Sequence, residues 1–271
     1  MSLLLRGRLR TWISFIFLSV LCLAVLLNFE EISKLPNTLL LVSRVSFGNR
    51  SVFWYCREKN TLALTFDDGI IDPEALKKGL ETFRKLQIPA TFYLIGKNAQ
   101  KWPELVKILD QDPLFMISAH TYAHRSLDEL NEKDARAEIK RGFDALTNIT
   151  GKKYRHIRPP YLKMDRYGIL ENSNYGVALF SLSAHDWRIN IEVERENLSE
   201  DKAILRFRDQ LMQNFKKELF LYFSRKGLIY LGHDRTLVYQ TLQEFLDLVR
   251  SQMPNVRFVR MDQCTGIPEV F

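Results

Sequence analysis

The sequence predicts an α/β protein: a parallel barrel one strand short of eight, placed after an N-terminal transmembrane helix. Short apolar segments rich in β-branched and aromatic residues alternate with helical patterns, as buried parallel strands joined by helical crossovers do. The glycine-rich phosphate fingerprint of nucleotide-binding open sheets is absent, which favours a barrel. The apolar run at residues 11–29 has about the length needed to cross a bilayer.

Four parts are expected along the chain: a basic cytoplasmic tail at 1–10, a transmembrane anchor at 11–29, a stem at 30–51 and a folded domain at 52–271. Because arginines in the tail favour the cytoplasm, everything after the anchor should lie outside the cell or in a secretory lumen, as in a single-pass type II protein. A secreted protein with a cleaved signal peptide is the alternative. No small-x-small cleavage site follows the run, which favours an uncleaved anchor.

The charge and the sequons agree with this topology. The net charge of +7 comes without a basic stripe interleaved with aromatic residues, so nucleic-acid binding has little support. Asn49, Asn148 and Asn197 begin N-x-Ser/Thr triplets, which are possible N-glycosylation sites in a lumenal domain. Such triplets also arise by chance. Oligomeric state is left open by the sequence.

Two cysteines bracket the folded domain, whereas Cys22 lies in the membrane run. Cys56 and Cys264 are a possible disulfide pair in an oxidising compartment, provided that the fold brings its ends together, as a barrel would. Two unrelated thiols are the alternative.

Seven strands and several helix boundaries are predicted. The strand candidates are residues 61–66, 90–95, 114–118, 154–157, 177–182, 227–231 and 256–260. The helix signals, in chain order, are Asp72 with Pro73 at an N-terminus, Ser126 with Glu129 as a capping box before a helix to about Thr147 with Gly151 beyond it, Asp165 before a short helix ended by Gly176, a long helix at 199–218, and Thr236 before the last helix.

Polar clusters follow five of the seven predicted strands. They are Asp67 and Asp68, His120 and His124, Arg158 to Tyr161, Asp186 and Trp187, and His233 and Asp234. Because the carboxyl ends of barrel strands meet at one face, these clusters predict a single site. Taken alone, the two aspartates before Gly69 are also typical of a turn.

The histidine pair predicts a metal site. Two histidines four residues apart can face the same way on one helical turn, and an aspartate from another strand end completes a set of two histidines and one carboxylate. Zinc fits such a set, and cobalt, manganese, nickel or iron(II) are alternatives. One of the paired aspartates would bind the metal while the other takes a proton from water, with His233 as a second proton carrier. A lone pair of histidines at this spacing also occurs by coincidence.

Together the segments TFDDG, HTYAH, RPPY, SxxDW and LxHD resemble the five ordered motifs of the polysaccharide deacetylase (NodB-homology) family, carbohydrate esterase family four, which includes chitin deacetylases. The resemblance covers about residues 52 to 265. It implies a distorted (β/α)7 barrel, an incomplete version of the eight-stranded one, and metal-dependent removal of acetyl groups from sugars.

The resemblance also implies residue roles, matched motif by motif. Asp67 would be the general base, with Arg158 as its partner, and Asp68, His120 and His124 would be the metal ligands. His233 would be the general acid, and Asp186 would be the carboxylate that orients it. The Tyr161 backbone N–H would stabilise the oxyanion, and Trp187 and Leu231 would line the groove. Two positions depart from the family pattern, because Ser183 replaces a frequent aspartate and Arg125 a frequent proline. We expect Ser183 to change local structure without loss of chemistry. His156 is expected to be a core or strand-end histidine, His185 a solvated rim residue, and Tyr122 a packing residue.

The leading expectation is therefore a membrane-anchored, metal-dependent deacetylase of N-acetylglucosamine polymers, with chitin or its oligomers favoured. Peptidoglycan or another acetylated glycan is an alternative substrate. A catalytically silent glycan-binding or cell-surface protein of the same fold is a second hypothesis. A non-haem iron oxygenase also uses two histidines and a carboxylate, but usually as a close HxD pair in an antiparallel barrel.

Overall fold

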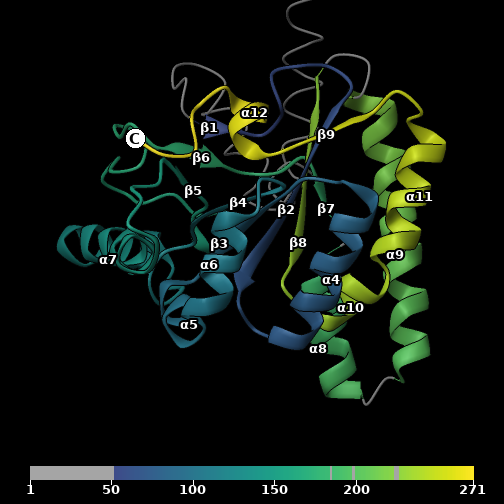
Figure 1. Ribbon diagram of the computed structural model, residues 1–271, viewed down its shortest axis with the longest axis horizontal. Helices are drawn as coiled ribbons and strands as arrows, with labels where there is room; N and C mark the ends of the chain where they lie inside the picture. The colour runs from purple at the N-terminus through teal and green to yellow at the C-terminus, as the bar shows by residue number, and fades with distance from the viewer. Residues whose placement is uncertain (1–51, 184, 197–198, 223–225) are drawn as a thin grey trace, which may run out of the picture. The chain divides into compact units, whose positions relative to one another are not determined.

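The computed structural model describes residues 52–271 except 184, 197–198 and 223–225 (Figure 1). The predicted tail, anchor and stem, together with Asn49 and Asn197, lie outside the described residues. Within the described part, no helix combines the length and the apolar character needed to cross a membrane.

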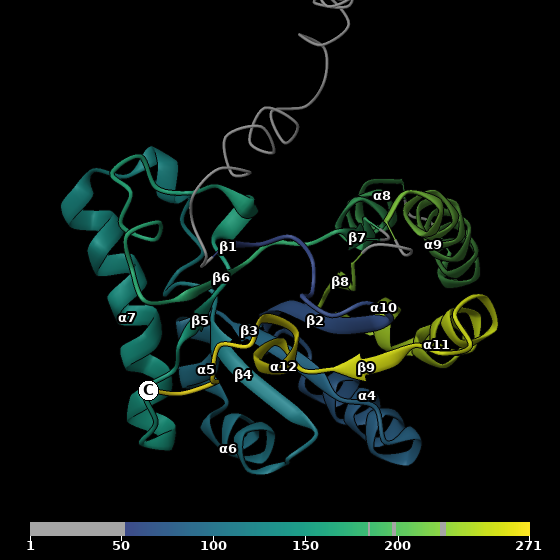
Figure 2. The ribbon, with the colours of Figure 1, turned by 90° about the horizontal axis from the view of Figure 1, so that it is seen from above.

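One parallel sheet forms the centre of the domain. Its strands are β1 (Val52–Phe53), β2 (Thr61–Gly69), β3 (Ala90–Leu94), β4 (Phe115–Ala119), β5 (His156–Ile157), β6 (Gly176–Ala178), β7 (Leu182–Ser183), β8 (Leu228–His233) and β9 (Arg257–Val259). The order across the sheet is β1-β6-β5-β4-β3-β2-β8-β7, and β9 pairs with the beginning of β2. The sheet curves into the distorted barrel that the sequence predicts, with helices standing outside the strands (Figure 2).

The predicted strand at 177–182 is wrong in extent, because the structure divides it into β6 and β7. The Leu179 N–H donates to the Phe53 carbonyl of β1, whereas the Ser181 N–H donates to the Ile229 carbonyl of β8. The chain thus changes its hydrogen-bonding partner within three residues. An apolar run shows that a segment is buried but does not show which strand it pairs with, so the break was not visible in the sequence.

Helices connect most of the strands. They are α4 (Pro73–Leu86), α5 (Gly96–Lys101), α6 (Pro103–Gln111), α7 (Glu132–Thr150), α8 (Asp186–Glu196), α9 (Glu200–Tyr222), α10 (Thr236–Gln240), α11 (Leu242–Gln252) and α12 (Met261–Thr265), with short 3-10 turns η1 (Leu127–Glu129) and η2 (Pro160–Leu162). The predicted helix at 199–218 corresponds to α9. Thr236 does begin a helix, α10, but two more follow it.

Two helix ends follow the predicted chemistry. The Asp72 carboxylate accepts hydrogen bonds from the backbone N–H groups of Glu74 and Ala75 at 3.1 Å, and Pro73 is the first residue of α4. At the C-terminal end of α7, Gly151 adopts the left-handed conformation with φ 78°, and its N–H donates to the Thr147 carbonyl.

Two other cap predictions are wrong. Ser126 donates to the Asp128 carboxylate before η1, and the N-cap of α7 is Asn131, whose side chain accepts from the Asp134 N–H. The Asp165 carboxylate collects the N–H groups of residues 167, 169 and 170 in a series of turns, and no helix forms there. Aspartate and serine bind local N–H groups in turns as well as at helix starts, so the residue type alone does not separate the two.

Strand β2 shows how the interior is divided. Leu62, Leu64 and Phe66 point outward into the large apolar core under the helices, where the Phe66 ring packs against Phe83 and Phe92 at centroid distances of 5.6 and 5.5 Å. The alternate residues Ala63, Thr65 and Asp67 face the barrel interior, as the two-residue period of a strand requires. The inward-facing side chains toward the carboxyl end of β2 are thus polar.

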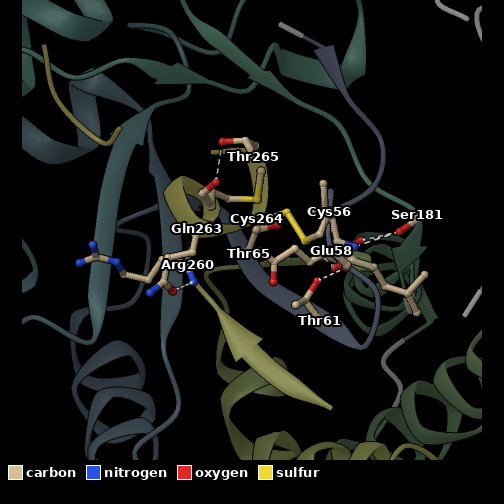
Figure 3. The surroundings of a disulfide bond; sticks show 12 residues. Cys56, Glu58, Thr61, Thr65, Ser181, Arg260, Gln263, Cys264 and Thr265 are labelled. Carbon is tan, nitrogen blue, oxygen red and sulfur yellow. Dashed lines mark hydrogen bonds between the residues drawn. A yellow bond between two sulfur atoms is a disulfide. The ribbon is translucent and has the colours of Figure 1, made fainter. Parts of the chain in front are cut away.

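The opposite end of the barrel is closed by apolar side chains and a disulfide. Cys56 and Cys264, separated by 208 residues, are joined with their Cα atoms 4.5 Å apart (Figure 3). The Arg57 N–H donates to the Cys264 carbonyl at 3.0 Å, so backbone and sulfur atoms both tie the start of the domain to α12. In Figure 2 α12 lies over the middle of the barrel, and its Met261 belongs to the interior cluster with Ala63.

We expect replacement of Cys264 by serine to lower the free energy of unfolding by about 2–5 kcal/mol, because the disulfide restricts a very long loop in the unfolded chain. Urea unfolding of the full chain measures the loss. Cys56→Ser should give the same loss and the double variant no more, while Cys22→Ser serves as the thiol control. An unchanged unfolding free energy in Cys264→Ser would contradict a stabilising disulfide.

Candidate active site

The inward-facing residues at the carboxyl ends of the strands converge on one site. Asp67 lies near the end of β2, His120 directly after β4, Arg158 directly after β5 and His233 at the end of β8. Asp67 and His233 are opposite one another in the parallel register of β2 and β8. The structure therefore brings together side chains from four strands that are separated by up to 166 residues of sequence, the interval from Asp67 to His233.

Arg158 is a fully buried cation, and each of its three guanidinium nitrogens donates a hydrogen bond. One guanidinium nitrogen, Nη1, donates to Asp67 Oδ1 at 2.8 Å and to Thr65 Oγ1 at 2.7 Å. The other nitrogens donate to the Ala178 and Leu179 carbonyls, and the guanidinium carbon lies 4.5 Å from the centre of the Tyr93 ring. These contacts hold Asp67 in one orientation, with its second carboxylate oxygen turned toward the site.

Asp68, His120 and His124 form a set suited to a divalent metal. One donor atom from each lies within 4.8 Å of the others. Asp68 Oδ1 is 3.5 Å from His120 Nε2 and 3.4 Å from His124 Nε2, yet this buried oxygen makes no hydrogen bond within the described residues. A buried carboxylate oxygen facing two imidazole nitrogens is the donor arrangement that a two-histidine, one-carboxylate metal site uses, so the residues fit the metal.

The ligand orientation is set by neighbours of these residues. His120 Nδ1 lies 2.7 Å from the Arg158 carbonyl oxygen, which can only accept, so Nδ1 carries the proton and Nε2 is free for a metal. Asn98 donates from its side chain to the Asp68 carbonyl at 2.8 Å. Asp68 itself has φ 71°, a left-handed conformation that turns it off the strand beside Asp67.

The two histidines do not lie on a helical turn, which corrects the expectation from their spacing. Residues 120–124 form a loop in which Thr121 has φ 61° and His124 has φ 58°. These left-handed residues turn both imidazole rings toward Asp68, with centroids 4.8 Å apart. The same separation of four residues is therefore reached by loop geometry that the sequence pattern does not specify.

For Asp68 and His120, neighbouring charges oppose the effect of burial on the pKa. Burial acts to raise the pKa of the Asp68 carboxyl, but the facing His120, together with His233 and His124, holds it well below its ordinary value. For His120, burial acts to lower the pKa, and the Asp67 and Asp68 carboxylates raise it above the ordinary value. The pKa of His124 is lowered by burial and by the neighbouring His120, which favours the neutral, metal-binding form.

His233 forms a second, separate pair with a buried carboxylate. Its Nδ1 lies 2.9 Å from Asp186 Oδ1, and its backbone N–H donates to Asp186 Oδ2 at 3.0 Å. Burial acts to lower the pKa of the imidazole, but the charge and hydrogen bond of Asp186 outweigh it and raise the pKa to about 9. His233 therefore holds a proton near neutral pH and can donate it from Nε2.

Aromatic and polar side chains border the site. The Tyr161 ring is 62% exposed and lies 4.7 Å from the His124 ring, and Trp187 is 42% exposed. Leu231 is buried on the inward face of β8. Beside His124, a pocket of about 530 Å³ includes Tyr161 and Arg125 in its lining, so the residue that departs from the family pattern borders this pocket.

Other residues singled out in the sequence have structural contacts. His156 is fully buried and its Nε2 lies 2.9 Å from the Ile267 carbonyl, as a core histidine. Tyr122 packs under the Arg141 guanidinium, 3.7 Å from the ring centre. Ser183 is buried and its hydroxyl accepts from the His185 N–H at 3.1 Å, so it shapes the turn before Asp186. His185 is half-buried rather than solvated.

Several site residues were not identified from the sequence. Thr65 and Tyr93 contact Arg158, and their inward position could have been found from the two-residue alternation of β2 and β3. Asp234 belongs to a polar cluster predicted from the sequence, but its contacts were not predicted. It is buried, accepts from the Ile71 N–H and the Tyr239 hydroxyl, and connects the turn after Asp68 to the turn after His233. No pattern in the sequence indicates these contacts, because the partners are 163 and 5 residues away.

Comparison with known proteins identifies the domain. Residues 55–180 match the family model described as polysaccharide deacetylase, so the chain contains a domain of the polysaccharide deacetylase family. This match covers the first three predicted motifs and ends before Asp186 and His233. The family and the barrel expected from the five motifs are thereby confirmed.

Two relatives and one solved structure illustrate the similarity. A peptidoglycan-N-acetylglucosamine deacetylase of Bacillus cereus is 35% identical over 137 residues, which are 48% of this chain and 47% of that protein. A chitin deacetylase of Colletotrichum lindemuthianum is 27% identical over 223 residues, 78% of this chain and 82% of that protein. The solved structure of the chitin deacetylase from that fungus superposes with a TM-score of 0.68 at 22% identity, covering 81% of this chain and 93% of the other.

The same fold also occurs in a pseudoenzyme of carbohydrate esterase family four from Bacillus anthracis. That structure gives a TM-score of 0.60 at 18% identity and covers 76% of this chain and 66% of the other. At this level of identity the similarity shows the fold alone, so residue roles depend on the geometry of this chain. The chain spans about half the length of the Bacillus cereus relative.

We expect replacement of Asp186 by asparagine to lower the pKa of His233 in the metal-free protein from about 9 toward its ordinary value of 6.5. Asparagine keeps the size of the partner but removes the negative charge that stabilises the imidazolium. At pH 8 His233 would then be largely neutral, whereas the unchanged protein keeps it protonated. NMR titration of the ring measures this, with exposed Asp247→Asn as control, and an unaltered titration would contradict the assigned cause.

Proposed function

We propose that this chain is a metal-dependent deacetylase that removes N-acetyl groups from N-acetylglucosamine polymers, with chitin or chitin oligomers as the favoured substrate, and releases acetate. The observation that carries the proposal is the register of β2 and β8, which places the proton acceptor Asp67 and the protonated His233 opposite one another, beside the metal set of Asp68. Amide hydrolysis needs both groups, because water must lose a proton and the amine must gain one.

The proposed chemistry assigns one task to each group. A divalent metal held by Asp68, His120 and His124, most simply zinc with cobalt, manganese or nickel as alternatives, would polarise the acetyl carbonyl and acidify water. Asp67, oriented by Arg158, takes a proton from the attacking water.

His233 completes the reaction from the other side of the site. It donates its proton to the sugar nitrogen as the C–N bond breaks, and the Asp186 carboxylate stabilises the imidazolium until then. We assign the backbone N–H of Tyr161 to the developing oxyanion. The half-exposed rings of Tyr161 and Trp187 offer apolar faces for sugar rings.

Chitin is preferred over peptidoglycan on the sequence matches, because the match to a chitin deacetylase extends over more of both chains than the match to the peptidoglycan deacetylase. The solved structures of both kinds of enzyme cover similar shares of this chain. A catalytically silent glycan-binding protein is the second candidate, supported by the pseudoenzyme of the same fold. The iron oxygenase alternative loses its support because the strand pairings described are parallel in every ladder.

We expect Asp67→Asn to reduce acetate release from chitin oligomers by about 10²–10⁴-fold, because the neutral amide cannot accept the proton from water. The full chain is stripped of metal, reloaded with zinc or cobalt and assayed for acetate, with exposed Glu104→Gln as the matched control. Zinc binding should survive in Asp67→Asn, since Asp67 is not in the ligand set. Bound zinc without acetate from chitin, peptidoglycan or other acetylated glycans would favour the silent protein.

We also propose that residues 11–29 anchor the protein in a membrane, with the deacetylase domain outside the cytoplasm. The full chain expressed in a eukaryotic host should remain in the membrane pellet after alkaline carbonate extraction. Its domain should be protected from added protease in sealed microsomes. A glycosidase-sensitive mass shift that becomes smaller in Asn148→Gln would agree with this topology, since Asn148 is exposed at the end of α7. Release into the supernatant would support cleavage or a soluble form.

A further inference from the structure

We propose that Glu138 on α7 is the positioning residue for the histidine loop, defined as residues 120–124, and that it sets metal affinity by holding His124 in place. This inference rests on the metal site of the proposed function. It assigns a task to a residue that contacts neither the metal set nor the acid and base.

The histidine loop needs external support because of its own backbone. Thr121 and His124 both adopt left-handed φ values, which residues with a Cβ atom rarely populate. The two ligands also differ in how they are held. His120 directly follows β4 and its Nδ1 is hydrogen-bonded to the Arg158 carbonyl, whereas within the described residues no side-chain hydrogen bond fixes His124. Its position therefore depends on the backbone of the preceding residue, Ala123.

Glu138 binds that backbone directly. Its Oε1 accepts a hydrogen bond from the Ala123 N–H at 2.5 Å. The Glu138 side chain makes no other hydrogen bond within the described part of the chain. The residue is only 4% exposed. A carboxylate is costly to bury, and a charge-assisted bond to a backbone N–H is a strong compensation.

Glu138 is an unusual residue for the buried face of α7. The buried face of this helix otherwise consists of apolar or small residues, namely Ala135, Ile139, Gly142, Phe143, Ala145 and Leu146. One acidic residue on that face has no role in apolar packing. Within the described residues, its carboxylate is hydrogen-bonded only to the histidine loop. We therefore infer that the carboxylate is there to hold this loop.

Two neighbours of Glu138 on α7 bring the helix into contact with the same loop. A Cβ atom at Gly142 would lie 2.7 Å from the Thr121 backbone, so only glycine permits this close approach. The Arg141 guanidinium lies over the Tyr122 ring at 3.7 Å. These residues are three and four positions after Glu138 and so share its face of the helix.

Helix α5 supports the other side of the histidine loop. The backbone N–H groups of Gly96 and Lys97 donate to the Thr121 and Tyr122 carbonyls, each at 2.9 Å. The loop carbonyls are thus held by α5, and the N–H before His124 is held by Glu138. Without the Glu138 acceptor, the loop would keep its α5 contacts but lose the one that fixes the second ligand.

The test compares two conservative variants that separate position from charge. Glu138→Gln keeps the length and an acceptor oxygen but loses the charge, whereas Glu138→Asp keeps the charge but is one methylene too short to reach Ala123. We expect zinc affinity within about threefold of the unchanged full chain in Glu138→Gln and weakened about 10–100-fold in Glu138→Asp. The visible spectrum of the cobalt-loaded protein should change only in Glu138→Asp. Glu132→Asp, an exposed pair partner of Arg136 on the same helix, is the matched control.

A second readout requires no metal. Amide hydrogen exchange at Ala123 in the metal-free protein should be at least about tenfold faster in Glu138→Asp than in Glu138→Gln, because only the glutamine protects that N–H. The reverse order of zinc affinities would show that Glu138 acts by its charge and would overturn the proposal. Equal exchange at Ala123 in both variants would also overturn it. Failure of the unchanged protein to bind zinc would instead contradict the proposed function and leave the exchange result to decide the role of Glu138.

Discussion

The buried guanidinium of Arg158 is the interaction on which the site depends. A charge with no exposed surface is tolerated only when it is paired and its donors are satisfied. Arg158 meets this requirement with the Asp67 carboxylate, the Thr65 hydroxyl and two carbonyls at the end of β6, and its own carbonyl accepts from His120. One residue thus connects Asp67, His120 and three separate strands inside the barrel.

The barrel interior is consequently divided into two zones. Toward the amino ends of the strands, inward positions carry apolar side chains, and the disulfide and α12 close this end. Toward the carboxyl ends, the same inward positions carry the charged groups. Since an unpaired charge in the apolar zone would be strongly destabilising, the division explains why the chemistry is confined to one face.

Around this centre, the site is held by contacts from outside the barrel. Asp186 holds His233, Asp234 joins the turns that follow β2 and β8, and α7 and α5 enclose the histidine loop. Metal ligands and proton carriers must keep fixed relative positions, and short loops with left-handed residues do not keep them unaided. Much of the helical layer therefore has a second purpose besides covering the sheet.

Much of the fold and most of the site chemistry could be predicted from the sequence. Six of the seven strands lie close to their predicted positions, and the caps at Asp72 and Gly151 have the expected geometry, because these signals are contained within a few neighbouring residues. The predictions at 177–182, Ser126 and Asp165 were wrong, since apolar runs do not identify a pairing partner and short polar residues cap turns as readily as helices.

The sequence by itself determined which chemical groups are available and that each follows a strand, because strand period and residue type are local properties. Only the tertiary structure decided that Cys56 meets Cys264, that the two histidines reach Asp68 through a left-handed loop, and that Glu138 holds that loop. Each of these depends on the distance between backbone segments far apart in the chain, and that distance is fixed by packing of the whole barrel.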